Sequence, residues 1–250
     1  MRTSIGASLT LGYSKAFSHH VVMSLLIGAR GRDFVVVLTD GISLRKKDGN
    51  TKVESRDLQK MFQIGDRPCV LAHHGQNELG QLKVNSVLTG ENFQKVQSRA
   101  WALGLNVAMA RTVNRLDSTV SQTLKSSKER GLFGLWFAGF WPCTGNPEIT
   151  ELVWQQSSPN RVRVSMLPHR ELVIGGSGLK FLREFLSKPI NKELNPANIL
   201  REPVEYSMAL VKKLYSIAEE RQKRAGEEGF GGQRRMAVIT RYGVDLGPLD

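Results

Sequence analysis

The chain of 250 residues is poor in cysteine and has no long apolar run. It contains only two cysteines, Cys69 and Cys143, which excludes a disulfide scaffold and any cysteine-rich zinc module. No stretch of about 18 consecutive apolar residues occurs, so the sequence predicts no membrane span. Neither an internal repeat nor a linker is visible, and the length suits one globular domain with a large core. We therefore expect residues 24–250 to form a single domain.

Acidic residues are scarce relative to basic ones. The chain has 35 Lys and Arg against 23 Asp and Glu, a formal net charge of +12. Such a charge permits contact with nucleic acid, anionic lipid or acidic protein but does not select among them. The basic residues are scattered over expected turns and helix ends and are not gathered with aromatic residues on one element. A nucleic-acid partner is therefore not expected.

The first 23 residues contain no unbroken apolar region, which argues against a secretory signal. They contain basic residues and several serines but no acidic residue. Their composition suits an organellar transit peptide. A pro-segment removed on maturation, a translation start at Met23 and a short extension of the fold stay open as alternatives. We expect a cytoplasmic protein, or an organellar one if this segment is a transit peptide.

Short apolar runs separated by turn residues begin at Ser24. They predict two hairpins, over residues 24–39 and 61–72, in one sheet, with a solvated turn at 45–50 between them. Apolar residues at steps of three and four predict one long helix, or two in tandem, over residues 92–126. Further strands are expected at 132–138, 151–154, 161–164 and 171–174, helices at 178–185 and 204–218, and a closing hairpin at 236–246. This order predicts an α+β domain with antiparallel sheets between helix layers.

Three segments together resemble a proteasome-type subunit of the amino-terminal-nucleophile hydrolase superfamily. The first runs from Ser24 across a hairpin to Asp40; family β-subunits begin at a threonine and reach an aspartate sixteen residues later. The second is Lys60 before an apolar strand, a few residues further from Asp40 than in the family. The third is the Gly-Ser-Gly loop at 176–178 before a helix. The resemblance covers about residues 24–246, lies nearest to the bacterial two-ring protease, and implies a four-layer αββα sandwich of antiparallel sheets.

The resemblance also implies roles for individual residues. Ser24 would be the nucleophile, with its own α-amine as the base, because a hydroxyl needs a base within hydrogen-bond reach. Asp40 and Lys60 would form a buried pair beside it, although a strict family count from Asp40 reaches Arg56. The backbone N–H of Gly75 would face the developing oxyanion. Ser177 would replace the serine that active members carry just after the loop, at the place of Leu179. No cofactor or metal is implied.

A free α-amine at Ser24 is the condition for this chemistry. Methionine aminopeptidases remove an initiator methionine before a small residue, so a start at Met23 would expose Ser24 directly. The late helix offers Glu219 and Glu220 as acids but lacks the serine that follows the acid in active members. A catalytically inactive ring subunit, a small-amide hydrolase and a basic binding module are therefore kept as alternatives. The implied partners are further copies in a ring, a peptide or unfolded-protein substrate and an ATP-dependent unfoldase.

Two adjacent histidines, His73 and His74, precede Gly75 on an expected strand. They are candidates to line a specificity pocket or to titrate near neutral pH. The simpler interpretation is that one is packed and the other solvated. Neighbouring strand residues point to opposite faces, so one zinc ion cannot easily bind both together with Cys69, and we expect no metal site.

Overall fold

The computed structural model describes residues 24–47, 50–75, 78–79, 82–126, 132–158, 161–169, 171–186, 188–227 and 229–249. The predicted leader at residues 1–23 lies outside the described residues. Two antiparallel five-stranded sheets and five α-helices dominate the described ranges, which is the mixed α and β composition expected from the sequence. No helix in these ranges is both long enough and apolar enough to cross a bilayer.

The first sheet has the strand order β12-β1-β2-β13-β14, with all neighbours antiparallel. Its strands are β1 Leu26–Arg30, β2 Val35–Thr39, β12 Leu172–Gly175, β13 Arg234–Thr240 and β14 Gly243–Leu249. The predicted hairpins at 24–39 and 236–246 are both present in it. The run of apolar residues in β2 is buried throughout, as expected for a strand covered on both faces.

The second sheet has the order β11-β10-β9-β6-β5. Its strands are β5 Met61–Gln63, β6 Cys69–Gly75, β9 Leu132–Phe140, β10 Pro147–Ser158 and β11 Arg161–Pro168. The predicted hairpin at 61–72 therefore exists but lies in this sheet, so the expectation that the first two hairpins share one sheet is wrong. The physical reason is the segment between the two hairpins, in which the chain passes from the first sheet to the second.

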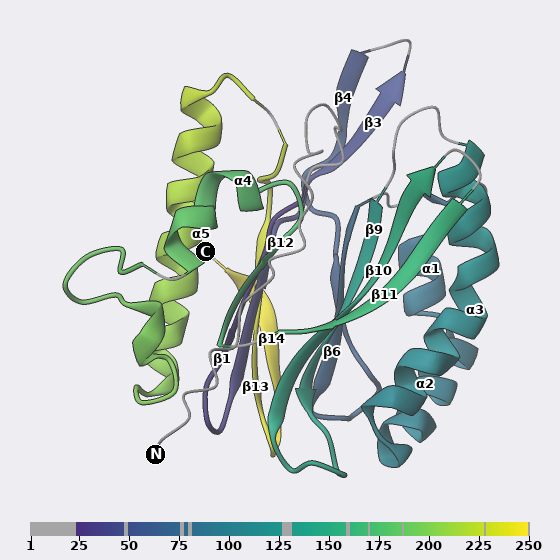
Figure 1. The fold of residues 1–250 in the computed structure, drawn as a ribbon, viewed down its shortest axis with the longest axis horizontal. Helices are drawn as coiled ribbons and strands as arrows, with labels where there is room; N and C mark the ends of the chain where they lie inside the picture. The colour runs from purple at the N-terminus through teal and green to yellow at the C-terminus, as the bar shows by residue number, and fades with distance from the viewer. Residues whose placement is uncertain are drawn as a thin grey trace, which may run out of the picture.

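The segment between the two hairpins contains a separate two-stranded hairpin of β3 Ser43–Lys47 and β4 Asn50–Ser55, which projects beyond the two sheets (Figure 1). Residues 45–47 and 50 of the predicted turn are therefore strand residues, and residues 48–49 lie outside the described residues. The hairpin lies in the connection between Asp40 and Lys60. A second short pair, β7 Glu78–Leu79 with β8 Leu82–Lys83, was not expected from the sequence.

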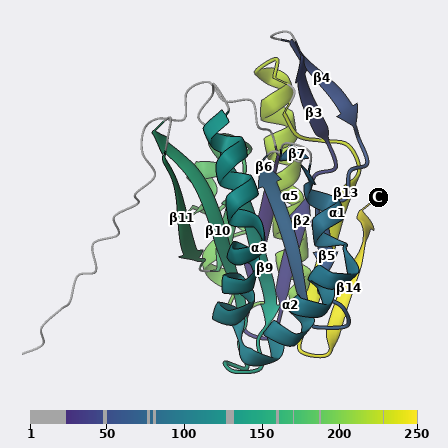
Figure 2. The same cartoon turned by 90° about the vertical axis from the view of Figure 1, so that its right-hand side faces the viewer.

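Helices cover the outer side of each sheet (Figures 1 and 2). Beside the second sheet lie α1 Val84–Leu88, α2 Glu91–Leu103 and α3 Leu105–Ser126. The helical pattern at 92–126 thus forms two helices, because Gly104 between them has a φ of 112°. Beside the first sheet lie α4 Leu179–Leu182, the 3₁₀ turns Arg183–Leu186 and Pro196–Asn198, and α5 Val204–Arg224. The helix predicted at 178–185 is therefore α for one turn only.

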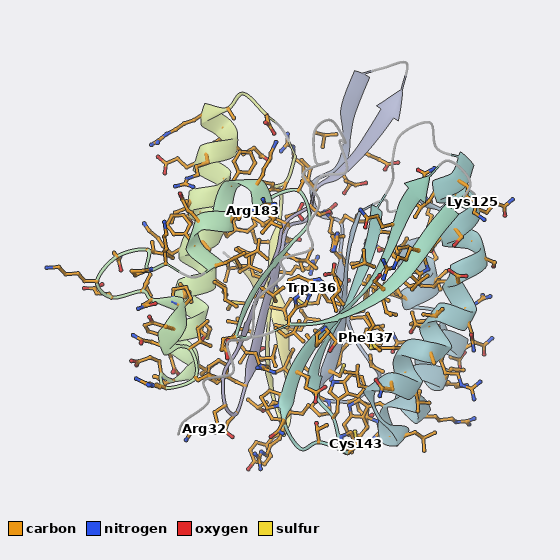
Figure 3. The ribbon with its side chains drawn as sticks, in the orientation of Figure 1. Arg32, Lys125, Trp136, Phe137, Cys143 and Arg183 are labelled. Carbon is orange, nitrogen blue, oxygen red and sulfur yellow. The ribbon has the colours of Figure 1, made fainter. Side chains whose placement is uncertain are left out.

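Apolar side chains fill three clusters: between α1–α3 and the second sheet, between the two sheets, and between the first sheet and α4 and α5. The adjacent residues Trp136 and Phe137 of β9 show the alternation that separates them, since successive strand side chains point to opposite faces. Trp136 lies between the sheets and Phe137 faces the helices (Figure 3). The two sheets therefore face each other, which allows residues at their ends to meet.

Candidate functional site

The hairpin of β1 and β2 brings Ser24 and Asp40 together. Its register pairs Leu26 with Thr39, so Ser24 and Leu25 before β1 lie beside Asp40 after β2. The backbone N–H of Asp40 donates to the carbonyl of Leu25 at 3.2 Å, and the N–H of Leu25 donates to Asp40 Oδ1 at 2.9 Å. The Ile42 N–H donates to Asp40 Oδ2 at 3.2 Å. The Asp40 carboxyl is therefore fixed by backbone groups on both of its oxygens.

Lys60 reaches this hairpin from the other sheet, where it directly precedes β5. Its Nζ lies 3.0 Å from Ser24 Oγ, 3.0 Å from Asp40 Oδ1 and 2.9 Å from Asp40 Oδ2. The three residues are only 1% (Ser24), 1% (Asp40) and 3% (Lys60) exposed. The alternative that Lys60 is a surface lysine and Asp40 an ordinary turn residue is therefore wrong. Residues 36 and 20 positions from Lys60 in the chain converge on its ammonium.

The hydrogen bonds around this pair are those of a carboxylate and an ammonium. Asp40 accepts bonds from two backbone N–H groups and from Lys60, while the three N–H bonds of an ammonium match the three oxygens around Nζ. Burial raises the pKa of Asp40 above its ordinary value, although the Lys60 charge and the N–H groups of Leu25 and Ile42 act to lower it. A positive charge thus lies in hydrogen-bond contact with the Ser24 hydroxyl.

The glycine-rich loop after β12 packs directly against the backbone of Ser24. Gly176 has a φ of +77°, and a Cβ there would lie 2.2 Å from the Ser24 carbonyl oxygen. The N–H of Gly178 donates to the same oxygen at 3.3 Å. The close approach requires glycine at position 176, both for its φ and for the missing side chain. The loop therefore fixes the residue whose hydroxyl meets Lys60.

The other two predicted site residues are not bonded to the hydroxyl of Ser24. Gly75 ends β6 with a φ of 103°, and Ser177 lies half-buried in the loop that contacts Ser24. Among the described residues, the hydroxyl of Ser24 is bonded by Lys60, and no hydrogen bond joins it to Gly75 or Ser177. The structure thus brings together Ser24, Asp40 and Lys60 out of the five residues predicted.

Both histidines before Gly75 are buried, so the expectation that one of them is solvated is wrong. Their side chains do point to opposite faces of β6. His73 contacts Asn85 and the ring of Phe133 on the helix side, and His74 points between the sheets. Both faces of this sheet are covered, which is why neither ring reaches solvent.

His74 belongs to a buried cluster that the sequence analysis missed. Its Nε2 lies 2.5 Å from Glu151 Oε1, and His169 Nε2 lies 3.1 Å from Glu151 Oε2. Burial alone raises the pKa of Glu151, but the hydrogen bonds from His169 and His74 outweigh it and lower the pKa to about 2. A Cβ on Gly134 would lie 2.1 Å from His74 Nε2, so this glycine leaves the space in which the two side chains meet.

One sequence signal for this cluster was available. Glu151 stands at two-residue spacing between Ile149 and Val153, on a strand where alternation predicts a common face. A carboxylate on the apolar face of a strand requires a partner, and a histidine on another buried strand is a natural one. Within the described residues, no group of three or more His, Cys, Asp or Glu side chains is arranged to hold a metal ion.

Comparisons with known proteins add no assignment to this geometry: no protein-family model and no curated protein sequence matches the chain.

Proposed function

We propose that the protein is a peptidase of the amino-terminal-nucleophile type, related to proteasome subunits, with Ser24 as its nucleophile. The observation that carries this proposal is the buried contact of Lys60 Nζ with both Ser24 Oγ and the Asp40 carboxylate. Burying a charged pair away from water is costly, and a hydrophobic replacement is often as stable. A buried charged pair beside a hydroxyl is therefore better explained by chemistry on that hydroxyl than by stability.

The base in this mechanism is the α-amine of Ser24, once the preceding residue has been removed. The amine takes the hydroxyl proton as Oγ attacks the carbonyl carbon of a peptide bond. In our proposal, the oxyanion of the resulting tetrahedral intermediate accepts a hydrogen bond from the Gly75 N–H. The Lys60 charge favours the developing negative charge on Oγ. Collapse breaks the C–N bond, the amine leaving group takes the proton, and water then hydrolyses the Ser24 ester.

Lys60 does not suit the role of base. A lysine accepts a proton only when it is neutral, and its Nζ here lies 3.0 and 2.9 Å from the two Asp40 oxygens, the arrangement of an ammonium that donates to a carboxylate. The contact with Ser24 is thus one in which the ammonium donates to Oγ. An uncapped α-amine supplies the missing base, with an ordinary pKa near 8.

The test compares a chain that begins at Ser24 with one that retains Met23, on a fluorogenic peptide. We expect turnover only from the chain whose intact mass shows a free Ser24, and loss of turnover in Ser24→Ala. Ser207→Ala is a matched control, because this buried serine of α5 has a hydroxyl without a hydrogen-bond partner in the described part of the chain. Equal rates for Ser24→Ala and the parent would contradict the peptidase proposal.

We also propose the four-layer αββα sandwich of this superfamily and self-association into a ring, with peptide or unfolded protein as substrate and an ATP-dependent unfoldase as a partner. Support for the fold comes from the facing sheets with helices on both outer sides (Figure 1). Support for association comes from two apolar side chains of α2, Val96 and Leu103, which are 45% and 71% exposed. Light scattering during size exclusion tests the ring, and a monomer at all concentrations would contradict it.

A further inference from the structure

The backbone on both sides of Lys60 is held by hydrogen bonds from two other elements. The N–H of His73 on β6 donates to the Lys60 carbonyl at 3.0 Å. Asn85 on α1 donates from Nδ2 to the carbonyl of Gln59 at 2.7 Å. The Asn85 Oδ1 lies 2.9 Å from His73 Nε2, which joins the two contacts into one chain of hydrogen bonds. The segment that presents the ammonium is thereby fixed from the strand and from the helix.

The donors and acceptors in this chain follow from one another. The carbonyl of Gln59 can only accept, so it faces the Nδ2 amide group of Asn85. Asn85 therefore turns Oδ1 toward His73, and His73 must donate from Nε2–H. The lone pair of the neutral ring is then on Nδ1, which is buried and has no hydrogen-bond partner among the described residues. Each polar group of the amide has a single role here.

The His73 ring stays neutral, with its proton on Nε2, at pH values well above its lowered pKa. Burial lowers the pKa of His73 to about 3, helped by the nearby charge of Lys60, while the hydrogen bond with Asn85 acts in the opposite direction. A second proton would have to bind at Nδ1, where no acceptor among the described residues is available for the new N–H group. The ring thus acts as a fixed neutral donor, held also by the ring of Phe133 at a centroid distance of 6.3 Å.

We propose that His73 and Asn85 are positioning residues that set the place of the Lys60 ammonium relative to Ser24 Oγ; we call the pair the His73–Asn85 clamp. Its catalytic consequence rests on the proposed function. Among the described residues, no hydrogen bond joins the clamp to Ser24 or Asp40, and its hydrogen bonds to the Lys60 segment end on the carbonyls of Gln59 and Lys60. Because the useful contact is a 3.0 Å hydrogen bond at the end of a long side chain, a small shift of this backbone removes it.

The first test is the kinetics of Asn85→Ala in the chain that begins at Ser24. We expect kcat to fall by about 10²-fold, the loss that a 1 Å misplacement produces, with KM changed less than threefold. His73→Gln, which keeps an N–H donor, should retain more activity than His73→Phe, which keeps only the ring packing. Ser86→Ala, on the exposed side of the same helix, is the matched control and should match the parent.

The second test does not depend on activity. A buried ammonium bonded to three oxygens exchanges its protons slowly with water, so the ¹⁵Nζ–H signal of Lys60 should be visible by NMR and absent in Lys60→Met. We expect it in the parent and in Ser86→Ala, and broadened or lost in Asn85→Ala. An Asn85→Ala variant with an unchanged Lys60 signal and a kcat within twofold of the parent would overturn the clamp. Failure of the proposed function differs from this result: the parent would then show no turnover or Ser24→Ala would retain it, while the Lys60 signal would still show whether Asn85 positions the ammonium.

Discussion

A double-mutant cycle on Asp40 and Lys60 tests whether the pair is buried and charged. Asp40→Asn leaves the ammonium, 3% exposed, without a counter-charge, and Lys60→Met leaves the carboxylate with only its two backbone donors. Removing one partner of a buried pair costs about 3–5 kcal/mol, a large part of the stability of a domain. The double variant leaves no buried charge, so its loss should be smaller than the sum of the single losses by about 2 kcal/mol or more.

Urea unfolding at pH 7, followed by tryptophan fluorescence, measures this coupling because Trp136, Trp141 and Trp154 are fully buried. The matched control is the ion pair of Lys95 and Glu91 on α2, whose side chains are 64% and 79% exposed; its coupling should stay below about 1 kcal/mol. Single losses near 1 kcal/mol that simply add up would refute the reasoning, since they describe a solvated pair.

Three further predictions concern the rest of the core. Gly134→Ala should lower the free energy of unfolding by about 2–4 kcal/mol, because the new Cβ displaces His74 from Glu151; thermal unfolding measures it, and an unchanged Tm would contradict the packing. Glu151 has its pKa lowered to about 2 from 4.5, so its contribution is complete above pH 4.5 and is lost as the pH falls toward 2. Unfolding of Glu151→Gln should therefore depend less on pH in this range than that of the parent, and parallel curves would rule the linkage out. A thiol reagent should label Cys143, which is exposed, quickly and Cys69, whose pKa is raised by burial, only after unfolding; equal rates would contradict the buried position of β6.

Local sequence patterns were sufficient to predict most helices and strands, but they did not predict how the strands are arranged in sheets. The hairpins at 24–39 and 61–72, the late helix and the closing hairpin follow from runs of apolar residues between turn signals. The assignment of those hairpins to two different sheets depends on contacts between strands far apart in sequence, such as β6 with β9. The spacing of apolar residues also continues across Gly104, where the helix ends. Such spacing indicates which face of a helix is apolar, but it does not indicate where the helical backbone is interrupted.

The site shows the same limit at the level of single residues. The family spacing counted from Asp40 leads to Arg56, whereas the structure places Lys60 beside Ser24 and Asp40, with the β3–β4 hairpin in the connection between Asp40 and Lys60. The sequence indicated Lys60 as a candidate because it precedes an apolar strand. It carried no comparable signal for Asn85, whose amide acts through hydrogen bonds to a strand and a loop that are distant in the chain.

Three buried nitrogens of the described residues do not suit the role of base in the proposed mechanism. Lys60 is committed to Asp40, the Nε2 of His73 to Asn85, and the Nε2 of His74 to Glu151. None of these three is bonded to the Ser24 hydroxyl as a proton acceptor in the described part of the chain. The proposed base is the backbone nitrogen of Ser24 itself, which is an amide as long as Met23 is attached and cannot take a proton. Under the proposed function, the contacts of Ser24, Asp40 and Lys60 are already formed and only the base is missing. We therefore expect removal of the preceding residue to produce activity without refolding of the domain.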